Sequence, residues 1–240
     1  MKKIFTLLCC IALSAQHSFI SAQATMKLWK GGEVVTTYKS AEVDSVTFAT
    51  SEEASGNVYM IDNHKFFDLG LPSGILWAEN NIGAETPTDD GDYFAWGETA
   101  PKDTYTSDNY FDPNFSTTVL DNDHDAAYVL WGKECHTPTS DEFMELLDNC
   151  DWTWTTENGV NGYKVTSKKN SSSIFFPASG CTCDGKFHDC GSAGYYWLST
   201  LEPDNAQYAY QIYFYNLCPK RYSNDRTMGF TIRPVVVPEL

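Results

Sequence analysis

One stretch of the chain, TSDEFMELLDNC, has apolar residues at helical spacing. Phe143, Leu146 and Leu147 fall on one side of this helix, and polar residues occupy the opposite side. Thr139 is followed three residues later by Glu142, which is a capping box: each side chain satisfies a backbone N–H at the start of the helix. The stretch is therefore predicted to be an amphipathic helix.

A second, shorter helix is predicted over residues 123–131, where Ala126, Ala127, Leu130 and Trp131 recur on one face. The other apolar runs are short and alternate with polar residues, which is typical of strands. These runs include Trp152 and Trp154 before Asn158-Gly159, then Tyr163 and Val165, Ile174 to Pro177, and residues 209–216 and 229–237. The pattern predicts a loop-rich α+β domain over residues 58–240, with two helices and short antiparallel sheets.

The N-terminal part of the chain has its own strand pattern. Within residues 23–50, two alternating runs flank Gly31-Gly32 and predict a β-hairpin, after which a third short strand ends at Phe48. Residues 51–57, SEEASGN, are polar and aperiodic, so they are predicted to form a linker to the main domain.

Residues 1–22 have the features of a secretory signal peptide. Lys2 and Lys3 precede an apolar run, and small residues follow up to Ala22, after which we expect cleavage. The chain is therefore expected to be exported, and to be secreted, periplasmic or located at the cell surface. No later apolar run is long enough to cross a bilayer, so no transmembrane segment is predicted.

The charge of the chain limits its partners. There are 16 Lys and Arg residues against 32 Asp and Glu residues, a formal net charge of −16. A broad phosphate-binding surface would work against this field, so nucleic acid is not an expected partner.

Six cysteines lie beyond the signal peptide. In an exported protein they are expected to form disulfide bonds or to remain free thiols, and their pairing is not assigned. A zinc site built from the cluster near His188 is disfavoured, because the cluster lacks the usual paired spacing. The cysteines are Cys135, Cys150, Cys181, Cys183, Cys190 and Cys218.

The most informative segment for binding is the run YAYQIYFYN and the basic stretch after it. Alternation places Tyr208, Tyr210, Ile212 and Phe214 on one side, which suits a core, and the remaining positions on the other. Tyrosine and arginine are frequent at binding hot spots. The alternative is a strand buried on both faces, with the basic residues neutralising nearby acids. The candidate ligand-binding residues are Gln211, Tyr213, Tyr215, Leu217, Lys220, Arg221, Tyr222 and Arg226.

Two acidic loops near this segment supply oxygen atoms of the type that calcium prefers. Solvated turns explain these loops better than a calcium site does, since Asp, Asn and Pro are common turn residues. We therefore expect no cofactor, with calcium as the open alternative. Its candidate ligands are Glu202, Asp204, Asn224 and Asp225.

Several strings in this order and spacing resemble one known family. They are FFDLGLPSGILWAENNIGAETPTDDGDYFAWGET, CHTPTSDEFMELLDNCDWTWTTENGVNGYKV, GYYWLSTLEPDNAQYAYQIYFYN and GFTIRPV. They are similar to the Fibrobacter succinogenes major paralogous domain family, which is common in exported proteins of gut Bacteroidota and has a C-type lectin-like fold. The resemblance implies paired N- and C-terminal strands, two helices and a loop-rich binding face.

The same superfamily includes formylglycine-generating enzymes and the variable proteins of diversity-generating retroelements. The enzymes use a cysteine pair near the closing strand, where this chain has Thr231 and Ile232. The resemblance therefore does not extend to catalysis, and no enzyme activity is expected. In the variable proteins, the stretch after a strand like GYYWLST is rewritten to change ligand choice. The resemblance thus favours a display surface on the C-terminal segment.

These observations together predict a recognition protein that binds an extracellular protein or glycan through residues 202–227. The alternatives are a structural or assembly component of the cell surface, and a divergent, inactive relative of the formylglycine-generating enzymes.

Overall fold

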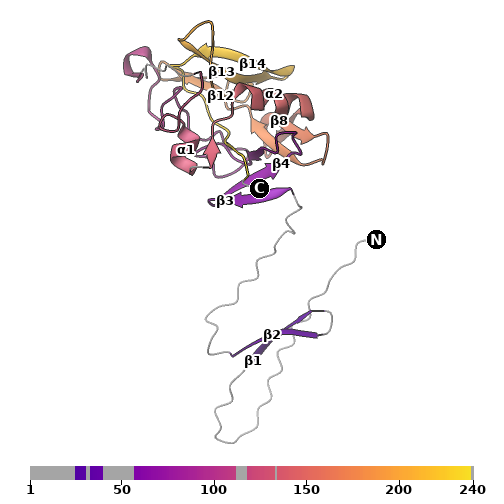
Figure 1. Cartoon of the computed structure of the whole chain (residues 1–240). Helices are drawn as coiled ribbons and strands as arrows, with labels where there is room; N and C mark the ends of the chain where they lie inside the picture. The colour runs from indigo at the N-terminus through magenta and orange to yellow at the C-terminus, as the bar shows by residue number, and fades with distance from the viewer. Residues whose placement is uncertain (1–24, 31–32, 40–56, 112–117, 133, 239–240) are drawn as a thin grey trace, which may run out of the picture. The chain divides into compact units, whose positions relative to one another are not determined.

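The computed structural model describes residues 25–30, 33–39, 57–111, 118–132 and 134–238. The chain divides into two units, residues 1–52 and residues 53–240 (Figure 1). The predicted signal peptide, the strand that ends at Phe48 and most of the predicted linker lie outside the described residues.

The first unit contains a β-hairpin. β1 (Thr25–Lys30) and β2 (Glu33–Lys39) pair antiparallel, and they flank Gly31-Gly32, where the sequence predicts the turn. The predicted hairpin is thus present in the structure.

The second unit begins with an antiparallel sheet in which the C-terminal strand is internal. The strand order is β3-β4-β5-β15-β6, and Val235 on β15 pairs with Trp77 on one side and His136 on the other. The two ends of this unit are therefore joined in one sheet. The strands are β3 (Val58–Ile61), β4 (His64–Asp68), β5 (Leu76–Ala78), β6 (Cys135–His136) and β15 (Val235–Val236).

The last strand is shorter than the sequence predicts. Only Val235–Val236 form a ladder, whereas Phe230 and Thr231 make isolated bridges to Phe94 and Tyr196. Pro234 has no N–H to donate, which limits continuous pairing through this segment. Residues 229–234 instead connect several elements as an extended, buried segment.

Three further antiparallel sheets follow along the chain. In each the neighbouring strands are consecutive, so the connections are hairpins or short loops. They are formed by β7 (Cys150–Glu157), β8 (Val160–Ser167) and β9 (Ser173–Pro177), by β10 (Cys181–Cys183) and β11 (Lys186–His188), and by β12 (Ala193–Leu201), β13 (Tyr208–Tyr215) and β14 (Cys218–Asp225).

The described residues contain two α-helices, both at the predicted places. α2 (Ser140–Asn149) begins with the predicted capping box, in which Glu142 N donates to Thr139 Oγ1 and Thr139 N donates to Glu142 Oε2. α1 (Ala126–Trp131) begins three residues later than predicted, because the Asp125 side chain accepts a hydrogen bond from Ala127 N and caps the helix there.

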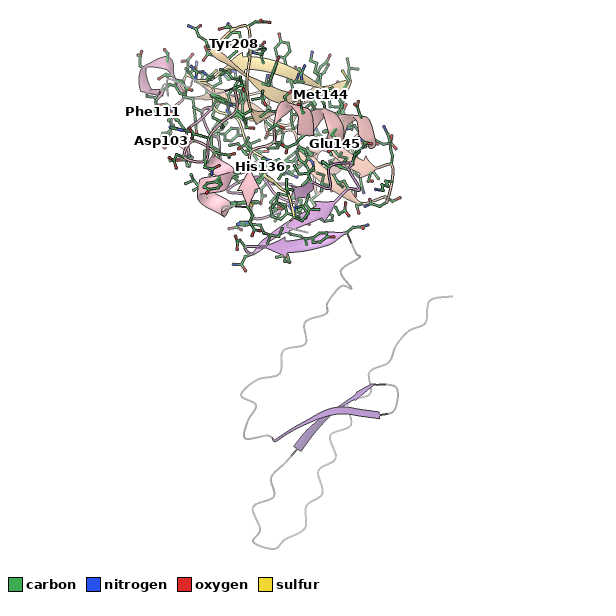
Figure 2. The ribbon with its side chains drawn as sticks, in the orientation of Figure 1. Asp103, Phe111, His136, Met144, Glu145 and Tyr208 are labelled. Carbon is green, nitrogen blue, oxygen red and sulfur yellow. The ribbon has the colours of Figure 1, made fainter. Side chains whose placement is uncertain are left out.

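Side chains fill the interior of the second unit (Figure 2). The buried apolar ones form two clusters. The first lies where α2 packs against β12, β13 and β14, and includes Phe143, Tyr196 and Phe214. The second includes Trp96, Trp197 and Phe230. The sheet β12-β13-β14 thus contributes side chains to both clusters.

Arg233 ties distant segments together inside this core. Its side chain is 1% exposed and donates hydrogen bonds to Asn81 Oδ1, Ala78 O and Phe175 O. Burial lowers the pKa of Arg233 to about 10, which keeps the guanidinium charged at neutral pH. The three acceptors offset the cost of burying that charge.

These features make the second unit a loop-rich α+β structure dominated by antiparallel sheets, as predicted. Among the described residues, no helix is both long and apolar enough to cross a membrane.

Candidate functional site

The alternation in the sequence assigns the β13 side chains to two sides, but neither side is buried along the whole strand. Tyr208, on the side predicted to suit a core, is 38% exposed at the start of the strand. Ile212 and Phe214 are fully buried in the first apolar cluster. Tyr213 and Tyr215 are on the opposite side and are half-buried. α2 packs against the sheet β12-β13-β14 (Figure 1), and its Phe143 shares the first apolar cluster with Phe214. Because side chains alternate along a strand, the tyrosines of the other side face away from that helix.

Three tyrosines from three strands gather around Tyr213. Its ring centroid lies 5.0 Å from that of Tyr195, 5.7 Å from that of Tyr215 and 6.3 Å from that of Tyr222. Lys220 Nζ lies 5.2 Å from the Tyr213 centroid and 5.3 Å from the Tyr222 centroid. We call these five side chains the ring face.

Cross-strand pairing explains why the ring face forms. Tyr195 on β12 and Lys220 on β14 are both the direct partners of Tyr213 on β13, so their side chains project on the same side of the sheet. Tyr222 follows Lys220 by two positions and therefore shares this side. The antiparallel pairing of β13 with β12 and with β14 brings these residues together although they are distant in the sequence.

Beside the ring face is an open cavity of about 480 Å³, which we call the ring pocket. Aromatic rings and polar groups line it together. The lining residues are Trp154, Asn161, Asp189, Gly191, Ser192, Ala193, Tyr213, Tyr215 and Asn216.

The carboxylate of Asp189 is held in place at this pocket. The Tyr195 hydroxyl donates a hydrogen bond of 2.7 Å to Asp189 Oδ2. The Asp189 carbonyl accepts hydrogen bonds from the backbone N–H groups of Ser192 and Ala193, which closes a tight turn. Burial and the negative charge of Asp189 raise the pKa of Tyr195, so its hydroxyl remains a donor at neutral pH.

Two of the predicted ligand-binding residues are buried, which corrects the sequence prediction. Gln211 is fully buried between its strand partners Trp197 and Tyr222, and Arg226 is 8% exposed. The second apolar cluster, which includes Trp197 and Phe230, covers this end of the sheet. Alternation predicts which side of β13 a residue faces, but not where along the strand that side is covered.

Arg226 lies over aromatic rings. Its guanidinium carbon is 5.6 Å from the Trp96 ring centroid and 5.7 Å from the Tyr110 ring centroid. Trp96 N also donates to the Arg226 carbonyl. Arg226 thus connects the C-terminal segment to the loop that follows Trp96.

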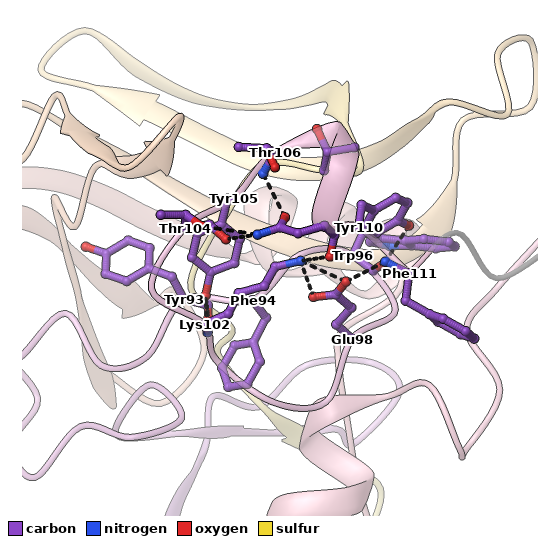
Figure 3. A network of polar contacts seen from close by, with 12 residues as sticks. Tyr93, Phe94, Trp96, Glu98, Lys102, Thr104, Tyr105, Thr106, Tyr110 and Phe111 are labelled. Atoms are coloured by element: carbon purple, nitrogen blue, oxygen red, sulfur yellow. Dashed lines mark hydrogen bonds and ion pairs between the residues drawn. The ribbon is translucent and has the colours of Figure 1, made fainter.

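A polar network orders that loop (Figure 3). Lys102 Nζ donates to Glu98 Oε1 at 2.9 Å and to the Asn109 carbonyl at 3.0 Å, and Phe111 N donates to the same Glu98 oxygen. Tyr110 donates its hydroxyl proton to the Trp96 carbonyl. The Glu98 carboxylate therefore links the two ends of the loop. This loop carries Tyr110, one of the two rings over which Arg226 lies.

Arg221 lies on the opposite side of the sheet from the ring face. It donates a hydrogen bond of 2.7 Å to Ser140 Oγ at the start of α2, and it lies 4.6 Å from the Tyr210 ring centroid. Leu217, in the two-residue turn between β13 and β14, is 73% exposed. Of the predicted ligand-binding residues, the structure brings together Tyr213, Tyr215, Lys220 and Tyr222.

The candidate calcium ligands come from two segments that meet near Tyr208. Glu202 N donates to the Tyr208 carbonyl, and Asp225 is the strand partner of Tyr208. Asp225 Oδ1 accepts a hydrogen bond from Thr227 N, and Asn224 Oδ1 accepts one from Asp225 N. These contacts are those of turn residues. Within the described residues, no group of three or more His, Cys, Asp or Glu side chains, Asp204 included, is placed to hold a metal ion.

All six cysteines of the second unit are free thiols. Of the two states expected from the sequence, disulfide or free thiol, the structure has the free thiol. Cys135, Cys150 and Cys181 are buried in the apolar clusters. Burial raises the pKa of Cys135 and Cys150 to about 11 and that of Cys181 to about 12. These thiols are therefore protonated and unreactive at neutral pH.

Sequence reasoning missed three residues of the site, namely Tyr195, Trp154 and Asp189. Tyr195 lies inside the apolar string GYYWLST, directly before Tyr196 and Trp197, which are both buried. The string therefore does not indicate that Tyr195 is more exposed than its neighbours. Its register opposite Tyr213 is visible only in the sheet. Trp154 and Asp189 come from separate loops and strands, and only the fold brings them to the ring pocket.

A family model described as a domain of unknown function, DUF8237, matches residues 155–235. The match covers roughly a third of the chain and contains the whole β12-β13-β14 sheet. No curated protein and no solved structure matches the chain.

Proposed function

We propose that this chain is an exported, non-enzymatic recognition protein that binds an extracellular protein or glycan through the ring face. The observation that carries the proposal is the gathering of four tyrosine rings and one ammonium group, all centred on Tyr213, on the partly open side of an anchored sheet. Tyrosine offers a large contact area with a polar tip and loses little side-chain entropy on binding.

Anchoring of the sheet supports this function. Phe214 and Ile212 hold β13 in the core, and Arg221 fastens β14 to α2. The rings are therefore presented on a backbone that is already ordered before a ligand arrives. Such preorganisation lowers the entropic cost of binding.

We further propose that the second unit has a C-type lectin-like fold. The internal position of the C-terminal strand β15, the two helices and the high loop content support this proposal. Glycans and proteins are both ligands of this fold class, which is consistent with a mixed aromatic and polar surface.

The test is to probe glycan and extracellular-protein arrays with the full chain and with the variants Tyr213→Ala and Tyr222→Ala. Each substitution removes a ring from the ring face, so we expect at least about a tenfold loss of affinity for the ligand found. Tyr59→Ala is the matched control, because Tyr59 is an exposed tyrosine on β3.

Arg221→Ala separates binding from stability. Because Arg221 lies on the α2 side, its loss should lower the melting temperature and leave ligand affinity nearly unchanged. No ligand on either array, together with concentration-dependent self-association, would count against recognition and for an assembly role. Equal loss of binding in Tyr59→Ala would also contradict the proposal.

A further inference from the structure

The ring pocket has the electronic character of a cation site. Trp154, Tyr213 and Tyr215 line it, and the faces of such rings are negative because of their quadrupoles. A cation placed against several ring faces gains from each of them. A neutral apolar group would gain only contact area.

Asp189 adds a carboxylate with free acceptor capacity to these rings. Its Oδ2 accepts the Tyr195 hydroxyl, while Oδ1 accepts no hydrogen bond from any residue in the described part of the chain. The turn around Asp189 fixes this group before a ligand binds. A ligand with an N–H donor and a positive charge therefore satisfies both the rings and the acid.

The chain itself shows that tyrosine rings of this sheet accept ammonium and guanidinium groups. Lys220 Nζ lies over Tyr213 and Tyr222 on the ring face itself. The Arg221 guanidinium makes the same kind of contact with Tyr210 on the other side of the sheet. The formal net charge of −16 also attracts cations to the whole molecule and repels anions.

We infer that the ring pocket binds a lysine or arginine side chain of a partner protein. The inference rests on the proposed function and names the chemical class that the ring face recognises. A protein side chain fits better than a quaternary ammonium group, because the latter has no N–H for Asp189. It fits better than a neutral sugar, because a sugar does not need the charge of the carboxylate.

The experiment is an NMR titration of the 15N-labelled full chain with capped amino acids. The cationic probes are Nα-acetyl-lysine N-methylamide and Nα-acetyl-arginine N-methylamide. The controls are the neutral Nα-acetyl-norleucine N-methylamide, choline and methyl glucoside. We expect both cationic probes to shift the backbone amides of Gly191, Ser192 and Asn216 with millimolar affinity, weakened by added salt.

Two variants test the charge logic. Asp189→Asn keeps an oxygen for the Tyr195 hydroxyl but loses the charge, so it should lower the affinity of the lysine probe about threefold or more. Lys220→Met removes a like charge from the Tyr213 ring, so it should raise that affinity about twofold. An anionic ligand would give the opposite result in both variants.

The inference is overturned if the norleucine probe, choline or methyl glucoside binds as tightly as the lysine probe, if Asp189→Asn has no effect, or if Lys220→Met weakens binding. The array experiment keeps this result separate from the proposed function. A ligand whose binding depends on Tyr213 and Tyr222 but not on Asp189, with no response to the cationic probes, would uphold the recognition function and reject the cation pocket.

Discussion

At the scale of single residues, His136 and Glu142 form the clearest pH-dependent contact of the second unit. His136 Nε2 lies 3.0 Å from Glu142 Oε1, and both side chains are partly buried. Burial lowers the pKa of His136, but the hydrogen bond and the negative charges of Glu142 and Asp125 outweigh it, so the net shift is upward. Burial raises the pKa of Glu142, and its contacts with His136 and Thr139 outweigh this and lower it.

The two shifts define the pH range in which the pair stabilises the fold. The contribution of His136 is complete below its unfolded pKa of 6.5 and is lost as the pH rises through the folded value. The contribution of Glu142 is complete above its unfolded pKa of 4.5 and is lost as the pH falls through the folded value. The pair therefore stabilises most between pH 4.5 and pH 6.5.

His136→Phe should accordingly destabilise the chain by about 1 kcal/mol near pH 5.5, and by less above pH ~8. Urea unfolding at the two pH values measures this difference. His188→Phe, at an exposed histidine on β11, is the control and should show no such pH dependence. If His136→Phe destabilises the chain equally at both pH values, the imidazole contributes packing but no ion pair with Glu142.

At the scale of elements, the pairing of β12 and β13 depends on a glycine. Gly194 is the strand partner of Phe214, and a Cβ at Gly194 would lie 2.1 Å from the Phe214 ring. Gly194→Ala should therefore lower the free energy of unfolding by about 1–3 kcal/mol, because the ring has to leave its position in the core. Chemical denaturation measures the loss.

The double variant Gly194→Ala with Phe214→Leu supplies the control. If the clash is the cause, the smaller side chain should relieve it, and the two substitutions together should cost less than the sum of their separate costs. Additive costs, or an unchanged stability in Gly194→Ala alone, would refute this explanation.

The same elements show what the sequence can predict. The capping box of α2 and the alternation along β13 are local, so they are read correctly from a few neighbouring residues. The ring pocket is not local, because Asp189 and Trp154 reach it through tertiary packing. The alternation predicts the correct side of the strand for Gln211, which is nevertheless buried because residues of the second apolar cluster cover that end of the sheet.

At the scale of the whole molecule, the free thiols of the second unit predict a stability that does not depend on redox conditions. A reducing agent should leave the melting temperature unchanged, because no disulfide constrains the described part of the chain. A thiol reagent at pH ~8 should modify the exposed Cys190 and Cys218 and the half-buried Cys183 in the folded chain. The buried Cys135, Cys150 and Cys181 should react only after unfolding.

Peptide mapping by mass spectrometry reports each position separately. Fast native labelling of Cys150, or a drop in the melting temperature on reduction, would contradict the burial and the free state of these thiols. The measurement also examines whether a chain with this net charge is held together by its core alone.

Neighbouring positions along β13 differ in how far a substitution would disturb the core. Ile212 and Phe214 are enclosed by the core, so exchanging them disturbs packing throughout the unit. Tyr213 and Tyr215 are half-buried on the other side, so exchanging them should disturb the core less. If the ring face binds a ligand as proposed, substitutions at every second residue of this strand would change its binding preference and leave the scaffold in place.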